Sequence, residues 1–210
     1  MPEDLTPFAW VGLSLPILLI TQRWTHRHLR GLALLLTGNP NWSVVLYAII
    51  LFPGVLLHEL SHWLTAGLLG VRTGAFSVLP KLETDGSVTL GYVQYYKGRN
   101  VGPFQESLIG AAPLITGTAA LLLIAFRVFG VSDLAAVIQR GDVDSLLLAL
   151  QSLFATNDFL LWLYLLFAIG NAMMPSASDR RGWPVFLGLL VGLAVILYLV
   201  GLREVLIQGL

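Results

Sequence analysis

The chain has 210 residues, of which 56% are hydrophobic and only 11% carry a charged side chain. Soluble domains usually contain about 25% charged residues, so this composition favours a protein that sits in a lipid bilayer. The net charge is zero, which gives no electrostatic basis for binding nucleic acid. The sequence has no cysteine, so disulfides, thiolate ligands and cysteine nucleophiles are excluded, and any metal ion must be bound by His, Asp or Glu.

The apolar segments predict an all-α polytopic membrane protein, a single domain over residues 1–210 with about five transmembrane helices. A spanning helix needs about 20 mostly apolar residues. The first segment, Pro7–Gln22, follows an acidic start without the basic region of a cleaved signal peptide, so we expect it to be retained. The other predicted spans are Trp42–Gly70, Glu106–Gly130, Phe159–Pro175 and Trp183–Leu202.

A basic stretch and a short apolar stretch separate the first two spans. Arg23–Arg30 contains His26 and His28, which are two residues apart and so do not share a helix face. Contact with lipid headgroups is the favoured interpretation for these histidines. Gly31–Thr37 is too short to span and is interpreted as an interfacial or re-entrant piece, which Asn39-Pro40 separates from the next helix.

Two polar regions interrupt the later spans. Thr73–Leu82 and Ser87–Tyr96 are rich in aromatic and β-branched residues and are separated by Thr84-Asp85-Gly86. An Asp-Gly pair between such runs predicts a small β-hairpin, which we expect at the membrane surface. The second region, Val131–Asn157, predicts short amphipathic helices outside the bilayer.

The second predicted span contains His58-Glu59-Leu60-Ser61-His62. Residues four apart lie on one face of a helix, so His58 and His62 can hold one metal ion from consecutive turns. This is the HExxH pattern, with two zinc ligands and a glutamate that serves as general base. A purely structural polar cluster is the alternative, but polar groups inside a membrane helix are costly, at least ~2.5 kcal/mol for a central charge.

A catalytic zinc site needs a third protein ligand, and Asp179 is the best candidate. Pro175 ends or kinks the fourth span, and residues 176–178 are expected to continue as non-helical backbone. If the spans alternate in direction, the second and fourth cross in the same sense, which brings Asp179 to the side of the membrane where the histidines lie. An interfacial ion pair of Asp179 with Arg180 or Arg181 is the alternative.

Other polar residues of the spans have simpler interpretations. Glu106 and Asp158 lie at the starts of predicted helices, where the helix dipole favours acids, and neither is assigned a catalytic role. Ser61, Asn171 and Ser176 are candidates for lining a polar cavity through which water reaches the site, although each can equally be satisfied inside the helix bundle.

Three motifs in order resemble the site-2 protease family of intramembrane zinc metalloproteases. They are HELSH within a membrane helix, the Gly-Pro-like sequence Gly110–Leu114, and the later set of Asn171, Pro175 and Asp179. The resemblance covers roughly Trp42–Trp183, so the proteolytic core is expected at approximately residues 42–183.

The resemblance implies a zinc metalloendopeptidase with the metal on His58, His62 and Asp179 and with Glu59 as the catalytic base. Its cofactor is then Zn²⁺, its partners are the lipid bilayer and a membrane protein substrate, and its location is the cell membrane as a multi-pass protein with the site near the cytoplasmic face. The activity implied is hydrolysis of peptide bonds in membrane-embedded or membrane-anchored proteins.

Two further functions stay open from the residues alone. The chain can be a catalytically inactive, zinc-binding scaffold or chaperone related to the proteases, although such a protein does not need a base at Glu59. A transporter with an intramembrane metal site needs polar groups along a whole path, whereas here they cluster at one level. Substrate-binding residues are unknown; the hairpin is either a strand that pairs with an unwound substrate or a simple flap.

Overall fold

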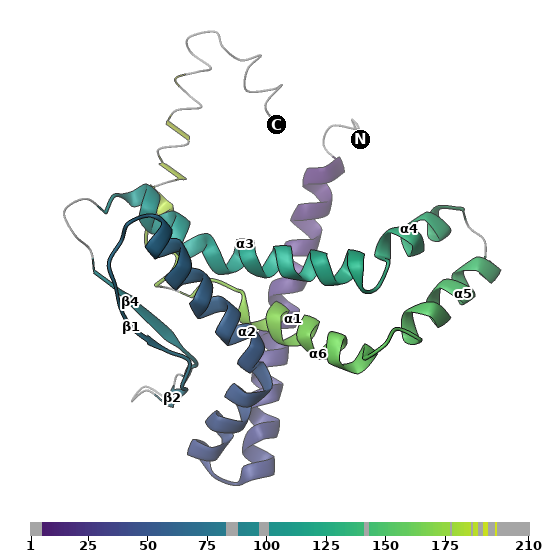
Figure 1. The fold of residues 1–210 in the computed structure, drawn as a ribbon, viewed down its shortest axis with the longest axis horizontal. Coiled ribbons are helices and arrows are strands. Elements are labelled where there is room, and N and C mark those ends of the chain that lie inside the picture. The colour runs from purple at the N-terminus through teal and green to yellow at the C-terminus, as the bar shows by residue number, and fades with distance from the viewer. Residues whose placement is uncertain are drawn as a thin grey trace.

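The structure is a computed structural model that describes residues 6–82, 88–96, 101–140, 143–176, 178–185, 187–188, 191–192 and 196. It is mostly helical, with short strands on one side (Figure 1). In chain order the elements are α1 (Thr6–Thr37), α2 (Pro40–Leu68), β1 (Thr73–Ser77), β2 (Lys81–Leu82), β3 (Val88–Thr89), β4 (Tyr92–Tyr95), α3 (Pro103–Arg127), α4 (Val131–Arg140), α5 (Val143–Phe154) and α6 (Phe159–Ala172).

Helix α1 is continuous over 32 residues, so the prediction that Gly31–Thr37 forms a separate interfacial piece is wrong. The basic stretch before it continues the helix, because none of its residues breaks one. The predicted break after it is confirmed: Gly38 has a φ of 61°, and the Asn39 side chain accepts hydrogen bonds from the backbone of Asn41 and Trp42. Pro40 then begins α2, as proline often does at a first helical position.

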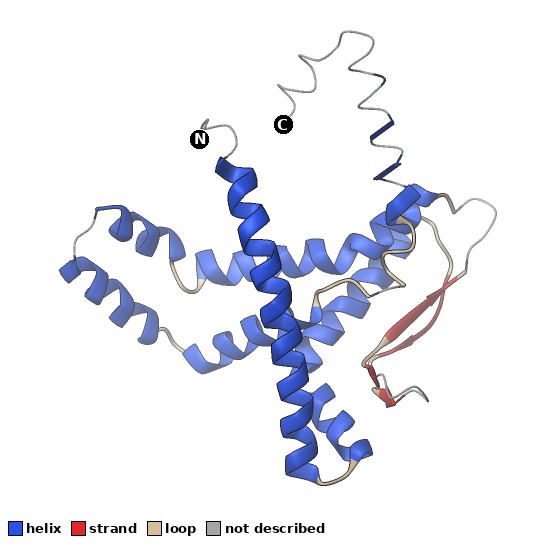
Figure 2. Ribbon diagram, turned by 180° about the vertical axis from the view of Figure 1, so that it is seen from behind, coloured by secondary structure: helices blue, strands red, loops and turns tan. Residues whose placement is uncertain are grey.

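Helix α2 is the centre of the fold. It contacts α1, α3, α6 and the strands, and α1 crosses the other helices on one side (Figure 2). Its first half buries Tyr47 and Leu51, which are 2% and 0% exposed. At Gly54 an added Cβ would lie 2.1 Å from the carbonyl oxygen of Ala168 on α6, so only glycine permits this close helix crossing, a device common in membrane helix packing.

The described residues contain two helices long and apolar enough to cross a membrane, α2 and α3. A third is present if α5 and α6, which meet at a bend of 86°, count as one broken span or re-entrant loop. The prediction of about five transmembrane helices is therefore not supported. Helix α6 has only 14 residues, about 21 Å at 1.5 Å per residue, and the predicted span Trp183–Leu202 lies mostly outside the described residues.

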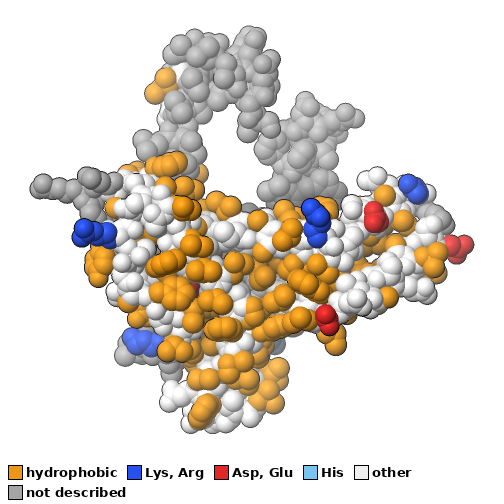
Figure 3. Space-filling view, in the orientation of Figure 1, with side chains coloured by type: hydrophobic (Ala, Val, Ile, Leu, Met, Phe, Trp, Pro, Cys, Tyr) orange, Lys and Arg blue, Asp and Glu red, His pale blue; other side chains and the backbone are white. Residues whose placement is uncertain are grey.

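The apolar helices leave large hydrophobic side chains exposed. Leu35, Leu68 and Leu160 are 84%, 87% and 76% exposed, and apolar side chains spread across the face in Figure 3 while charged ones lie mainly toward its edges. Large exposed apolar patches mark membrane or protein contact surfaces, which agrees with association with a membrane.

The predicted hairpin is confirmed in its pairing. β1 pairs with β4 in antiparallel fashion, with Ser77 opposite Tyr92. β2 pairs with β3, with Lys81 opposite Thr89. The predicted turn at residues 84–86 lies outside the described residues, and the position of the hairpin relative to a membrane stays a prediction.

The region Val131–Asn157 contains two short helices, α4 and α5, as predicted. They extend from the ends of α3 and α6 away from the strands (Figure 1), and α4 buries none of its residues. Glu106 lies in the first turn of α3, where it suits the helix dipole. Asp158 precedes α6 with a left-handed φ of 56° and makes no side-chain cap.

Candidate metal centre

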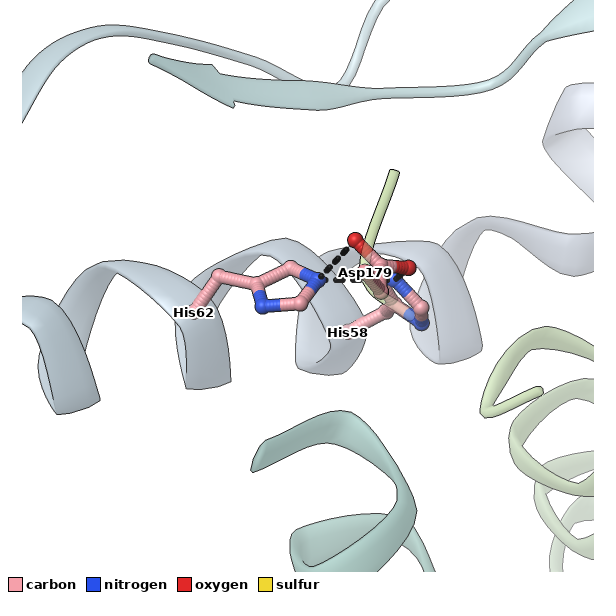
Figure 4. Close-up of side chains that lie close together, drawn as sticks. All are labelled: His58, His62 and Asp179. Carbon is pink, nitrogen blue, oxygen red and sulfur yellow. Dashed lines mark hydrogen bonds and ion pairs between the residues drawn. The ribbon is translucent and has the colours of Figure 1, made fainter. Parts of the chain in front are cut away.

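His58, His62 and Asp179 converge at the side of α2 (Figure 4). Each offers one ligand atom, and these atoms all lie within 4.8 Å of one another. The Nε2 atoms of the two histidines are 3.1 Å apart. Asp179 reaches them from the turn after α6, with Oδ2 at 3.6 Å from His58 Nε2 and Oδ1 at 3.3 Å from His62 Nε2. The three residues can therefore hold a metal ion.

Both imidazole rings are oriented by backbone carbonyls of neighbouring helices. His58 Nδ1 lies 2.7 Å from the carbonyl oxygen of Ala172, at the end of α6. His62 Nδ1 lies 2.8 Å from the carbonyl oxygen of Ile109 on α3. A carbonyl only accepts, so each Nδ1 donates and Nε2 is left as the ligand atom. Metal-binding histidines in proteins are held in this way by partners outside the ligand set.

This hydrogen bonding gives a direct test of whether a metal ion fits. With both Nδ1 atoms protonated, the neutral rings of His58 and His62 point two Nε2 lone pairs and the carboxylate of Asp179 at one another. The arrangement needs a shared positive charge, either a proton on an Nε2 or a metal ion. Tetrahedral zinc with bonds of 2.0–2.1 Å separates its ligand atoms by roughly 3.3 Å. The two Nε2 atoms, 3.1 Å apart, are close to that spacing, and each Asp179 oxygen lies 3.3 or 3.6 Å from one of them.

The turn that carries Asp179 is fixed locally. The backbone N–H of Ser176 donates to Asp179 Oδ2 at 2.6 Å, and the Asp179 N–H donates to Ser176 Oγ at 3.3 Å. Burial acts to raise the pKa of the Asp179 carboxyl, but hydrogen bonds from His58, His62 and Ser176 outweigh burial and hold this pKa well below its usual range. The carboxylate therefore stays ionised, as a metal ligand must.

The alternative role for Asp179, an ion pair with a neighbouring arginine, is not seen among the described residues. Arg180 donates from Nε to the carbonyl oxygen of Ser176, at 3.2 Å. The ion pairs of Asp179 are those with the two histidines. Non-helical backbone after α6 is present at residues 173–176, as the sequence predicts.

Gly110 is what lets the Asp179 turn reach the histidines. An added Cβ at Gly110 would lie 1.9 Å from the backbone oxygen of Asp179, a distance that no pair of such atoms tolerates. From the sequence, Gly110 is notable only as part of the Gly-Pro-like motif. Its role is steric: α3 presents a bare backbone at this point, and the turn packs directly on it.

Glu59 lies on the same turn of α2 and is 7% exposed. The backbone between β3 and β4 covers it, because an added Cβ at Gly91 would lie 2.7 Å from Glu59 Cγ and 2.9 Å from Oε1. The hairpin therefore closes over the side of α2 that carries the predicted general base. Sequence reasoning missed Gly91, although an isolated glycine beside a strand often marks such a close backbone approach.

A cavity of about 840 Å³ joins Glu59 and the three candidate ligands. Asn171 and Ser176 line it, as the sequence analysis proposed. Ser61 does not line it: its hydroxyl donates to the carbonyl oxygen of His58 at 2.7 Å, which is the alternative of a serine satisfied within the helix.

The expectation of a headgroup contact is wrong for His26. Its Nδ1 bonds the hydroxyl of Tyr47, its Nε2 lies 3.0 Å from the carbonyl oxygen of Asn171, and its side chain lines the cavity. His28 instead points outward and lies 2.8 Å from the carbonyl oxygen of Trp24 through Nδ1. The two histidines do point to different sides of α1, as their spacing predicts.

No protein-family model, curated protein or solved structure matches this chain. The resemblance to site-2 proteases thus stays a prediction from three motifs. A functional assignment has to rest on the chemistry of the site.

Proposed function

We propose that this chain is an intramembrane zinc metalloprotease of the HExxH type, a multi-pass protein of the cell membrane. The observation that carries the proposal is the convergence of two oriented Nε2 atoms and one carboxylate beside a buried glutamate, in a cavity against a helix of membrane-spanning length. His58, His62 and Asp179 are the proposed ligands, and Glu59 is the proposed base.

The donor set favours zinc over the common hard cations. Mg²⁺ and Ca²⁺ prefer six or more oxygen ligands, whereas imidazole nitrogens suit zinc and its transition-metal neighbours. Three protein ligands with one position left open is the arrangement of catalytic zinc sites. The absence of cysteine makes a closed, purely structural thiolate site impossible.

When bound, the zinc ion would lower the pKa of a water molecule to about 7 and polarise the substrate carbonyl. Glu59 would serve as the general base that accepts a proton from the water molecule attacking the carbonyl carbon. Glu59 then delivers that proton to the amide nitrogen, the C–N bond breaks, and a carboxylate and an amine are released. The burial of Glu59 under Gly91 keeps its carboxylate beside the reacting atoms.

The substrate class follows from the setting of the site. The cavity lies between helices whose outer surfaces carry exposed leucines, which suits a substrate that is itself embedded in or anchored to the membrane. A membrane helix hides its peptide bonds in its own hydrogen bonds and must unwind before cleavage. Residues of β3 and β4 also line the cavity, so an unwound substrate segment in the cavity would lie next to these strands.

The test is cleavage of a membrane-anchored reporter by purified protein in lipid nanodiscs. Glu59→Gln should keep bound zinc and lose cleavage, because the amide cannot accept the proton. Asp133→Asn on α4, an exposed carboxylate outside the cavity, is the matched control and should cleave normally. Undiminished cleavage by Glu59→Gln contradicts the protease proposal, and bound zinc without any cleavage by wild-type protein indicates the scaffold instead.

A further inference from the structure

One face of α1 forms a basic wall of the cavity that contains the candidate metal ligands. Gln22, Arg23, His26, Arg27 and Arg30 all line that cavity. They are spaced so that they fall on one side of the helix. The proposed function uses none of them, so three arginines face a proposed active site without an assigned role.

The wall lies close to the candidate metal centre. His26 on α1 bonds the carbonyl oxygen of Asn171, and His58 on α2 bonds the carbonyl oxygen of the next residue, Ala172. Consecutive residues are 3.8 Å apart between Cα atoms, so both helices are attached to neighbouring points of α6. The arginines that flank His26 and the three candidate ligands line this one cavity.

The arginines have no acidic partner among the described residues. The ion pairs of Asp179 are with His58 and His62. Arg30 stacks on Tyr47, with Cζ 5.4 Å from the ring centroid. Three positive side chains thus share the cavity with the carboxylates of Glu59 and Asp179, and a divalent ion adds two positive charges.

The opposite face of α1 differs in chemistry. Trp24 is 61% exposed and stacks with His28, with ring centroids 4.2 Å apart. Tryptophan is typical of the interface between membrane and water, so this outward side suits lipid headgroups. Arg23, Arg27 and Arg30 lie on the other side of α1, where they are exposed and line the cavity, so a ligand in the cavity can reach them.

We propose that Arg23, Arg27 and Arg30 form a subsite for an acidic side chain, aspartate or glutamate, of the substrate peptide. The inference rests on the proposed protease function, because it takes the ligand of the cavity to be a peptide chain. Arginine binds carboxylates through paired, charge-assisted hydrogen bonds. The subsite therefore selects substrates with an acidic residue near the scissile bond and rejects those with a lysine there.

A binding experiment tests the subsite separately from catalysis. The full-length Glu59→Gln protein, in phosphatidylcholine nanodiscs, is titrated with synthetic peptides of one Leu/Ala-rich membrane sequence. The peptides carry Glu, Gln or Lys, placed in turn along the segment. We expect the best Glu peptide to bind about tenfold more tightly than its Gln partner, the Lys peptide to bind most weakly, and the preference to fall with added salt.

Two variants assign the preference to the wall. The triple variant Arg23→Gln, Arg27→Gln, Arg30→Gln should bind the Glu and Gln peptides equally. The matched triple variant Arg72→Gln, Arg127→Gln, Arg140→Gln changes the same charge outside the cavity and should keep the preference. Because a triple variant can fail to fold, the single change Arg27→Glu is a second arm, and it should shift the preference toward the Lys peptide.

The outcomes separate this inference from the proposed function. Equal binding of all three peptides by the protein with the intact wall overturns the subsite. The titrations are repeated with phosphatidylglycerol added to the nanodiscs. If the arginine triple variant changes only the response to this lipid, the arginines contact headgroups and the subsite is overturned. Cleavage of reporters without any charge preference overturns the subsite and leaves the protease proposal standing. A charge preference in binding without cleavage by wild-type protein supports the subsite and removes the protease.

Discussion

The two walls of the cavity are built in different ways. One wall, called the α2 wall here, carries His58 and His62 on α2 and Asp179 on the turn after α6. Each of these side chains is fixed by a hydrogen bond to backbone: the histidines to carbonyls of other helices, and Asp179 to an N–H within its own turn. On the α1 wall, Arg23 and Arg27 face the same space without a described acidic partner. Side chains held by backbone suit a small ion at a fixed point, whereas unpaired cations suit a ligand that arrives from outside.

The largest effect should come from the histidines of the α2 wall. His58→Ala removes one of three ligands, so the dissociation constant for zinc should rise by about a thousandfold or more. The exposed His28→Ala, on the outer face of α1, is the matched control and should leave zinc binding unchanged. Competition with a chromogenic chelator measures both, and equal zinc affinity in the two variants would break the comparison between the walls.

The next largest effect is expected from Asp179. Asp179→Asn keeps the shape of the side chain but replaces the carboxylate by a neutral amide, a weaker ligand for a divalent ion, so zinc affinity should fall by about a hundredfold. The arginine triple variant of the α1 wall should not weaken zinc binding, because it removes positive charge. The same competition assay decides the matter, and weaker binding in the arginine variant would show that the walls act as one unit.

A smaller effect is expected where a helix only supports the ligand. Gly110→Ala places a methyl group against the Asp179 backbone and should lower zinc affinity about 10- to 100-fold by displacing the turn. Gly67→Ala on α2 is the control, because nothing lies within 4 Å of its added Cβ. Alanine is favoured over glycine in helices by about 1 kcal/mol, so neither change should weaken its own helix. Equal zinc binding in the two variants would therefore contradict the close packing of Gly110 on the Asp179 turn.

The smallest effect on the metal should come from His26. His26→Ala removes one hydrogen bond of the buried Tyr47 hydroxyl, which keeps Arg30 as a partner, and should lower the free energy of unfolding by about 0.5–1.5 kcal/mol, with less than a tenfold change in zinc affinity. His28→Ala should change stability by less than about 0.5 kcal/mol. Thermal unfolding in detergent compares them, and equal stability would show that His26 does not join α1 to α2.

The sequence predicted the part of the site that depends on helix periodicity. His58 and His62 are four residues apart on a long apolar helix, so their common face follows from geometry. Asp179 was chosen because it follows the break at Pro175 and because the spans were assumed to alternate in direction; the full set of spans is not supported among the described residues. The hairpin pairing followed from the alternation of residues on both sides of an Asp-Gly pair.

The missed features depend on backbone and on tertiary packing. The carbonyls of Ile109 and Ala172 orient the histidines, but a carbonyl belongs to every residue and leaves no trace in the sequence. His26 was placed against lipid because its basic neighbours suggested an interface; its partner Tyr47 lies on another helix. The prediction of about five spans is not supported among the described residues, because apolar length alone does not tell a full span from the 14-residue α6.

X-ray absorption at the zinc edge tests the central claim most directly. The purified wild-type protein should show two imidazole nitrogens at about 2.0–2.1 Å and one carboxylate oxygen at about 2.0–2.2 Å from one zinc ion per chain. The Asp179→Asn variant should lose the carboxylate contribution and keep the imidazoles where zinc remains bound. A wild-type protein that purifies without zinc, or a bound zinc ion without two imidazole ligands, would contradict the account.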